Sequence, residues 1–363
     1  MENVQVNFRV FQKIDFRSLL GFIISGVLLW LTFHSSGLQL KDISIHGTQW
    51  YYFGAAIIAF VVATWVQSVR AKLLWINETQ KGHQVNTYSS LIIGNFYNAL
   101  LPGNLGDGIR AWHFSRKQRV PFSSSMAAVL TEKWIDAQMF IGLTIILFLL
   151  KPFTNHYIFW AICNTSLLVM VLSAVYALML RYKKIEKFIW RVVIRLRKPG
   201  RFLFRLYKYA TWQMRAIKTN GAIPQYVLFC AITLILNVAQ FLFLLKTSGI
   251  SGPVLSIYTA YLMAVSMMII AIIPSAPGNI GVMHYGIYVV LILSAQQYGV
   301  KLGSAELQAY AVLGIYTHLS YLLPELFLGG IYAVAERKIL FEPKLSLQDK
   351  SVAIEGKSSN ISV

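Results

Sequence analysis

The sequence predicts an all-α integral membrane protein, a polytopic helix bundle of about eight spans plus re-entrant segments. Hydrophobic residues make up 56% of its 363 residues, and the mean hydropathy is +0.56. Soluble domains are only about 45–50% apolar. Several segments are apolar for about 18 residues or more, the length that crosses a hydrocarbon core of about 30 Å. The predicted spans are 16–34, 50–70, 121–150, 156–180, 222–246, 254–273, 282–298 and 307–334.

The formal net charge of +19 is concentrated in one place. Between Arg181 and Lys218 there are thirteen Lys or Arg residues and a single acid, Glu186. In a membrane protein such a stretch is expected in the cytoplasm, where each basic residue near anionic headgroups contributes about 1 kcal/mol. Lys187 and Arg191 follow a four-residue spacing that fits a basic helix in the interface, and a solvated basic loop is the alternative. We therefore expect anionic membrane lipids as partners and no nucleic acid.

Basic residues also predict the orientation of the chain. Arg9, Lys13 and Arg17 place the N-terminus in the cytoplasm, and four predicted spans then lead to the cytoplasmic stretch 181–220. A fifth crossing at the short apolar segment 88–101 would break this agreement. Because basic residues flank this segment on both sides, we expect it to be re-entrant in the cytoplasmic membrane.

Two short motifs interrupt the apolar sequence. They read Pro-Gly-Asn-Leu-Gly from position 102 and Pro-Gly-Asn-Ile-Gly from position 277. Proline lacks a backbone N–H and glycine permits positive φ, so helices should break here. Paired breaks in two halves of a membrane protein indicate the binding site of a transporter, whereas ordinary short loops are the alternative. The expected break residues are Pro102, Gly103, Gly106, Pro277, Gly278 and Gly281, with Asn104 and Asn279 as backbone contacts for a substrate.

The two motifs divide a single predicted domain, 1–340, into related halves. The halves cover about 16–180 and 222–334, and a disordered tail is expected at 341–363. If every predicted span crosses, the tail returns to the cytoplasm. If instead 254–281 forms a re-entrant pair from the outside, the tail lies on the other side.

Charged residues inside the 121–150 span carry the strongest local signal. An ionised residue near the bilayer centre costs about 2.5–3.5 kcal/mol, so intramembrane charge indicates function. Glu132 and Asp136 are four residues apart and share one helical face, and Lys133 can pair with Asp136. Asp136 should lie about 6 Å deeper than Glu132.

A second charged pair, Asp107 and Arg110, directly follows the first break. Arginine can bind a phosphate through two hydrogen bonds, and a broken helix leaves free N–H groups for an anion. We therefore expect a phosphate-headgroup site of Asn104, Arg110 and free backbone, with Glu132 and Asp136 positioning Arg110 or Lys133. The alternative is a closed salt-bridge cluster that only holds the helices together.

His284 comes three residues after the second break, and it could titrate during transport. A hydrogen-bonded structural histidine is the alternative.

Other chemistry is not expected from the motifs. Both cysteines, Cys163 and Cys230, fall inside apolar spans, which argues against a disulfide framework or a metal site. The chain has no Walker A, H-E-x-x-H, G-x-S-x-G or C-x-x-C motif. We expect no cofactor.

Three sequence runs together resemble a known family. They read LPGNLGDGIR at 101–110, VLTEKWID at 129–136 and PSAPGNIGV at 274–282. The resemblance, over about 15–335, is to the transmembrane region of lysylphosphatidylglycerol synthases, a family that includes stand-alone flippase-like proteins. The chain departs at Lys133, where the family commonly has arginine, and at His284, where it often has glutamate. Both residues belong to the expected headgroup site.

The resemblance implies movement of lipids between leaflets. We expect the chain to flip an anionic phospholipid or lipid-linked precursor across the cytoplasmic membrane, and a separately encoded lipid-modifying transferase is a candidate partner. No segment is long enough for the family's soluble aminoacyl-transferase domain, so we expect no enzyme. The alternatives are a membrane-embedded enzyme that modifies a lipid headgroup and an accessory subunit of an envelope-assembly complex. The sequence does not identify the lipid, the energy coupling or the oligomeric state.

Overall fold

A computed structural model describes residues 16–38, 49–75, 87–150, 156–270, 273 and 275–341. These residues are helical almost throughout, and no strand occurs among them, which confirms the predicted all-α class. The basic N-terminal residues and the predicted tail beyond Phe341 lie outside the described residues. The helices are α1 (Phe16–Ser36), α2 (Trp50–Lys72), α3 (Tyr88–Leu100), α4 (Gly106–Gln118), α5 (Phe122–Leu150), α6 (His156–Arg181), α7 (Lys183–Ile194), α8 (Lys198–Thr219), α9 (Ile223–Thr247), α10 (Ile257–Ile270), α11 (Val282–Gln297), α12 (Ser304–Ala335) and α13 (Arg337–Phe341), with 3₁₀ turns η3 (Leu73–Trp75), η4 (Pro102–Asn104), η5 (Gly252–Val254) and η6 (Pro277–Asn279).

Each of the eight predicted spans contains a helix with bounds within a few residues of those expected. By length and composition, five helical segments of the described residues can cross a membrane, or six if the bent pair α6 and α7 counts as one span. The structure therefore belongs to a polytopic membrane protein.

The first motif lies at the tip of a helical hairpin. Lys117, near the end of α4, donates a 2.8 Å hydrogen bond to Ser89, near the start of α3. The two helices are therefore antiparallel, and the open end of the hairpin is where α3 begins and α4 ends. Their approach near the tip requires glycine, because a Cβ at Gly106 would lie 2.0 Å from the carbonyl oxygen of Gly94. The segment 88–101 thus leads to a turn from which α4 runs back beside α3, the path expected of a re-entrant segment.

The second motif lies at the tip of a second hairpin, formed by α10 and α11. The Ser256 and Tyr298 hydroxyls, at the outer ends of these helices, are 3.1 Å apart. At the tip, Ser25 of α1 accepts a 2.8 Å hydrogen bond from the backbone N–H of Ala276. Gly281 has φ +81°, and a Cβ there would lie 2.0 Å from the Ser25 carbonyl oxygen. Only glycine fits this close approach.

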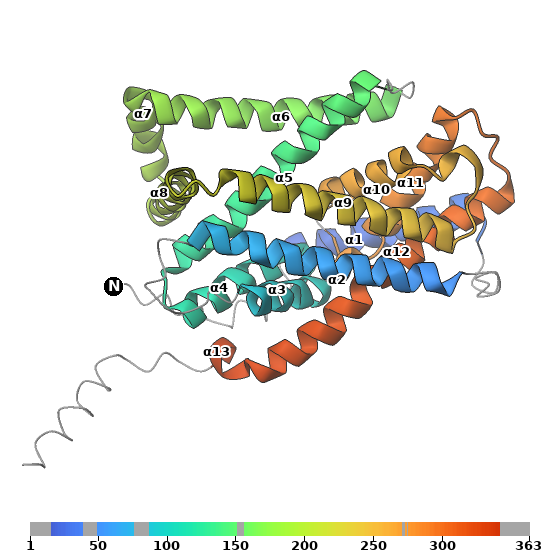
Figure 1. Ribbon diagram of the computed structural model, residues 1–363, viewed down its shortest axis with the longest axis horizontal. Helices are drawn as coiled ribbons and strands as arrows, with labels where there is room; N and C mark the ends of the chain where they lie inside the picture. Colours follow the sequence, from blue (N-terminus) through green and yellow to red (C-terminus); the bar gives the residue numbers. More distant parts are fainter. Residues whose placement is uncertain are drawn as a thin grey trace, which may run out of the picture.

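The two hairpins open at opposite ends of the bundle, and their tips meet inside it (Figure 1). At one end, Glu336 after α12 pairs with Lys117 of α4 at 2.7 Å. We call this the basic end, since α7 and α8, with most of the thirteen basic residues of 181–218, also lie there (Figure 1). At the opposite end, the start of α2 bonds the end of α9 through Gln49 and Thr247 at 3.3 Å. Where the tips meet, Gly278 packs against Ala99 of α3.

This arrangement corrects the prediction for residues 254–298. Segments 254–273 and 282–298 were predicted as separate spans, with 254–281 as an alternative re-entrant pair. They instead form the hairpin α10–α11 together. Since α12 then runs to the basic end, the end of α12 and the turn after α2 lie at the same end of the bundle. This is the side that the prediction with all spans crossing gives for the end of the last span.

The main apolar core lies beside the second hairpin. It is built from α2, α9, α10, α11 and α12, and its fully buried members include Leu244, Leu245, Ile287 and Leu313. A smaller cluster lies at the basic end, where the rings of Trp75 and Phe114 are 4.4 Å apart. The polar residues described below lie between these two clusters along α2 and α9.

The packing of the first hairpin gives a testable expectation. Gly106→Ala should lower the stability of the detergent-solubilised protein by about 1–3 kcal/mol, because the new methyl group meets the backbone of α3. Gly108→Ala, two residues along the same helix, has no neighbour within 4 Å of its Cβ position. The control should be neutral or slightly stabilising. Equal melting temperatures for the two variants would contradict the close approach of α3 and α4.

Candidate functional site

The charged residues of α5 are held by ion pairs from two neighbouring helices. Glu132 accepts hydrogen bonds of 2.7 and 2.9 Å from Nη2 of Arg110 on α4, and both side chains are buried. This agrees with the expectation that Glu132 positions Arg110. Because each charge is matched by the other, the pair can lie among apolar helices without an unpaired ion.

Asp136 pairs with a residue that the sequence analysis did not single out. Arg70 of α2 donates from Nη1 to Oδ1 of Asp136 and from Nη2 to Oδ2, the second bond being 2.9 Å long. Arg70 is completely buried. Its guanidinium also lies 3.2 Å from the sulfur of Cys230 and 5.5 Å from the centre of the Tyr226 ring. Asp136 remains a quarter exposed, so one side of the pair faces open space.

The pairing expected between Lys133 and Asp136 does not occur. Lys133 instead contacts Asp107 of α4 at 2.8 Å, in a pair that is half exposed on the lysine side. The physical reason is that Arg70 approaches Asp136 from α2 with two hydrogen bonds, a geometry that lysine cannot provide. All three pairs therefore run between helices, and they fix α5 to α2 and α4.

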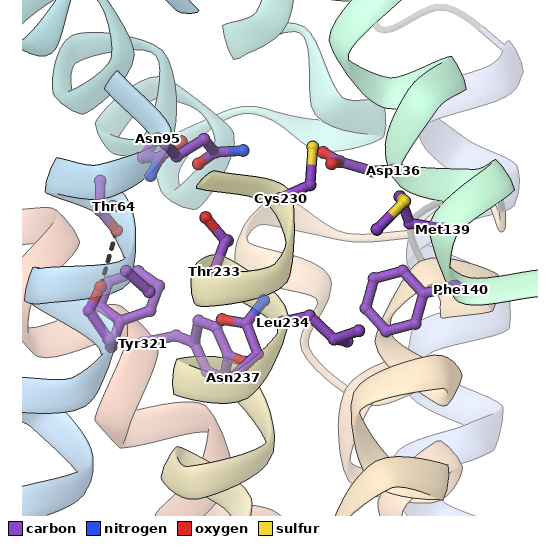
Figure 2. Close-up of a pocket in the computed structure, with 13 residues that line it drawn as sticks. Thr64, Asn95, Asp136, Met139, Phe140, Cys230, Thr233, Leu234, Asn237 and Tyr321 are labelled. Atoms are coloured by element: carbon purple, nitrogen blue, oxygen red, sulfur yellow. Dashed lines mark hydrogen bonds between the residues drawn. The ribbon is translucent and has the colours of Figure 1, made fainter. Parts of the chain in front are cut away.

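A cavity of about 190 Å³, lined by both polar and apolar side chains, lies beside the Arg70–Asp136 pair. Figure 2 shows Asn95 and Asp136 on either side of Cys230, with Asn237 farther along α9 and Tyr321 contributed by α12. The walls come from α2, α3, α5, α9 and α12. The lining residues are Phe60, Ala63, Thr64, Gln67, Asn95, Asp136, Met139, Phe140, Cys230, Thr233, Leu234, Asn237 and Tyr321.

The residues around the second motif form a separate group. Ser275 donates a 2.6 Å hydrogen bond to the side chain of Asn279, and the Gly281 N–H donates to Nδ1 of His284 at 3.3 Å. The His284 ring lies against the ring of His318 of α12, with centroids 5.0 Å apart. His284 and Asn279 do not line the cavity. The structure therefore does not join them to the charged residues in one described pocket.

Among the residues predicted for the site, Asp136 alone lines the cavity, while Arg110, Glu132, Asp107 and Lys133 form the neighbouring ion pairs. Asn104, Gly103 and Gly106 lie at the tip of the first hairpin, and Gly278 and Gly281 lie at the tip of the second. The three pairs match the closed-cluster alternative, whereas the adjoining cavity has the polar walls that a ligand site requires. Both features are present.

The polar wall from α9 was missed, although the sequence carries a signal for it. Cys230, Thr233 and Asn237 recur at helical spacing inside an apolar span, so they share one face. Gln67 and Arg70 of α2 are three residues apart in the same way. In the sequence, Arg70 is one of the basic residues that precede the segment 88–101, and that position gives no sign of a partner for Asp136.

No group of three potential metal ligands occurs among the described residues.

Comparison with known proteins identifies the family. The profile of the lysylphosphatidylglycerol synthase TM region matches residues 18–326. The chain belongs to this family. No curated protein and no solved structure matches the chain. The matched residues include both hairpins and the residues that line the cavity, and the match ends inside α12.

The burial of Arg70 predicts a large effect of removing its partner. Asp136→Asn should destabilise the protein by about 3–5 kcal/mol, because a buried guanidinium loses its counter-charge. Asp107→Asn, the matched change in the exposed pair, should cost no more than about 1 kcal/mol. Thermal melting of the purified protein in one detergent compares the two.

A double substitution separates charge from packing in this experiment. Arg70→Met with Asp136→Leu removes both ions and should recover most of the stability that Asp136→Asn loses. If the double variant were less stable than Asp136→Asn, the loss would not come from an uncompensated charge.

Proposed function

We propose that the chain moves an anionic phospholipid or a lipid-linked precursor between the two leaflets of the cytoplasmic membrane. The observation that carries the proposal is this cavity, which brings polar side chains together among apolar helices and next to a buried ion pair. Polar side chains within a membrane are costly and are kept where a substrate or ion must pass. Membership of the lysylphosphatidylglycerol synthase TM region supports a lipid as that substrate.

The walls of the cavity suit a headgroup rich in hydrogen-bonding groups. They offer the amides of Gln67, Asn95 and Asn237, and the hydroxyls of Thr233 and Tyr321. The one ionised wall residue is Asp136, a carboxylate. A phosphate would therefore bind away from Asp136, while hydroxyl or amino groups of the same headgroup would bind near it.

The broken helices offer candidate anion contacts outside the lining of the cavity. The N-termini of α4 and α11 directly follow the two motifs, and the first N–H groups of a helix favour negative charge. In each motif the Gly and Asn have positive φ, at +68° and +56° in the first and +65° and +57° in the second. This shared backbone conformation supports the assignment of Asn104 and Asn279 to equivalent roles in two related halves.

We infer transport without chemical change of the lipid. Asp136, the carboxylate that lines the cavity, is bound to Arg70, and Glu132 beside it on α5 is bound to Arg110. Both oxygens of each carboxylate already accept hydrogen bonds from that arginine, so neither carboxylate is free to act as a base toward a substrate. This argues against the lipid-modifying enzyme. A separately encoded transferase could supply a modified lipid, and the basic end would lie in the cytoplasm.

A leaflet-exchange assay tests the proposal. Full-length protein is reconstituted into liposomes with fluorescent phosphatidylglycerol, its lysyl form or a polyprenyl phosphate, and a membrane-impermeant quencher reports the outer leaflet. Wild type should accelerate the exchange of at least one of these lipids, with its mass unchanged. Asn237→Leu, which removes a polar wall, should slow the exchange about three- to tenfold.

Ile235→Leu is the matched control, because Ile235 lies on the exposed face of the same helix. It should exchange lipid at the wild-type rate. If no lipid exchanged faster than in empty liposomes, autonomous flipping would be refuted. A changed lipid mass would instead favour the enzyme, and unaltered exchange in Asn237→Leu would exclude this cavity as the path.

A further inference from the structure

A second site lies at the basic end, on the hairpin formed by α7 and α8. The chain bends by 113° between α6 and α7, so α7 runs across the end of the bundle rather than through it (Figure 1). The two helices pack closely, since a Cβ at Gly200 would lie 1.9 Å from the Val193 carbonyl oxygen. The ring of Trp190 is 5.1 Å from the ring of Tyr207. α8 in turn packs against α5, which fixes the hairpin to the bundle.

The outer surface of α7 has an apolar strip beside a basic strip. Phe188 is 64% exposed and Val192 is 49% exposed, in line with Ile185 one turn earlier. Lys187 and Arg191 form the neighbouring strip, also exposed. A helix with this pattern lies in the membrane interface, with its apolar side chains among acyl chains and its cations near headgroups. A lipid surface is therefore the expected cover for this strip.

A cavity of about 420 Å³ opens between α7 and α8. Three of its lining residues are cationic and one is acidic, so the walls carry a surplus of two positive charges. Aromatic side chains provide much of the remaining surface. The lining residues are Lys183, Glu186, Tyr207, Lys208, Tyr209, Thr211, Trp212 and Arg215.

Glu186 positions the two lysines of this cavity. Its carboxylate lies 2.9 Å from the ammonium group of Lys183 and 3.4 Å from that of Lys208. The hydrogen bond from Lys183 lowers the pKa of Glu186, so this carboxyl is ionised at neutral pH. Glu186 is buried, whereas both lysines are more than half exposed. Their remaining N–H donors are therefore available at the open side of the cavity.

We propose that this cavity is a binding site for one anionic phospholipid, whose phosphate contacts Lys208 and Arg215. The lipid source follows from the surroundings, because Trp212 at the cavity is exposed and the apolar strip of α7 lies on the same hairpin. Tryptophan is typical of the level of the headgroups. The charge surplus of the walls complements a phosphodiester, which carries one negative charge.

The proposed lipid site is separate from the transport cavity. The two cavities share no lining residue and no lining helix. They are linked by the packing of α8 against α5, which lines the transport cavity. The proposal therefore stands whether or not the chain flips lipids, and a binding assay tests it alone.

Native mass spectrometry of the full-length protein measures this binding. Delipidated protein in a neutral detergent is titrated with phosphatidylglycerol or with phosphatidylcholine of the same chains. Lys208→Gln with Arg215→Gln should weaken the first phosphatidylglycerol bound by about tenfold or more, because each lost cation near the headgroup weakens binding. Binding of the zwitterionic lipid should change by less than about twofold.

Lys187→Gln with Arg191→Gln is the matched control, with the same loss of charge on the outer strip of α7. It should weaken the first bound lipid by less than about threefold. Equal weakening by both pairs would overturn the site in favour of diffuse attraction to the basic end. Displacement of the lipid by equimolar glycerol phosphate would overturn the lipid assignment. If the double variant melts early, Arg215→Gln alone serves, because Arg215 is exposed.

Discussion

The structure depends on one constraint, that backbone polar groups within a membrane must find partners inside the protein. Both motifs break a helix far from either end of the bundle, which leaves backbone groups without their usual partners. The two breaks meet each other and α1, where Ser25 accepts the hydrogen bond of Ala276. The close contacts of Gly106, Gly278 and Gly281 follow, since backbone must pack against backbone there.

Charge neutralisation constrains α5 in the same way. Three charges in five residues would oppose insertion of this helix, yet each meets an opposite charge on another helix. Two partners come from α4, in the first hairpin, and one comes from α2. The ion pairs therefore hold the first hairpin and the cavity wall in a fixed relation.

Much of the fold follows from local sequence properties. Apolar length predicted a helix in each of the eight segments, and the basic flanks of 88–101 predicted that this segment turns back, because both signals act over short distances. The hairpin α10–α11 was not assigned, since α11 is apolar enough to resemble a full span. The partner of Asp136 could not be deduced either, because Arg70 and Lys133 are both able to pair with it. Only the packing of α2 against α9, beside α5, brings Arg70 to that carboxylate.

The two hairpins are alike in backbone but unequal in chemistry. Their tips share the same Gly and Asn conformations and they open at opposite ends, as inverted repeats do. Only the first hairpin contributes to the cavity, through Asn95, whereas the second packs into the apolar core. In inverted-repeat transporters, one repeat moves against the other around a fixed site. Because the ion pairs tie the first hairpin to α5, relative movement would occur more readily at the tip contact of Ala99 with Gly278, where small residues meet without charge pairing.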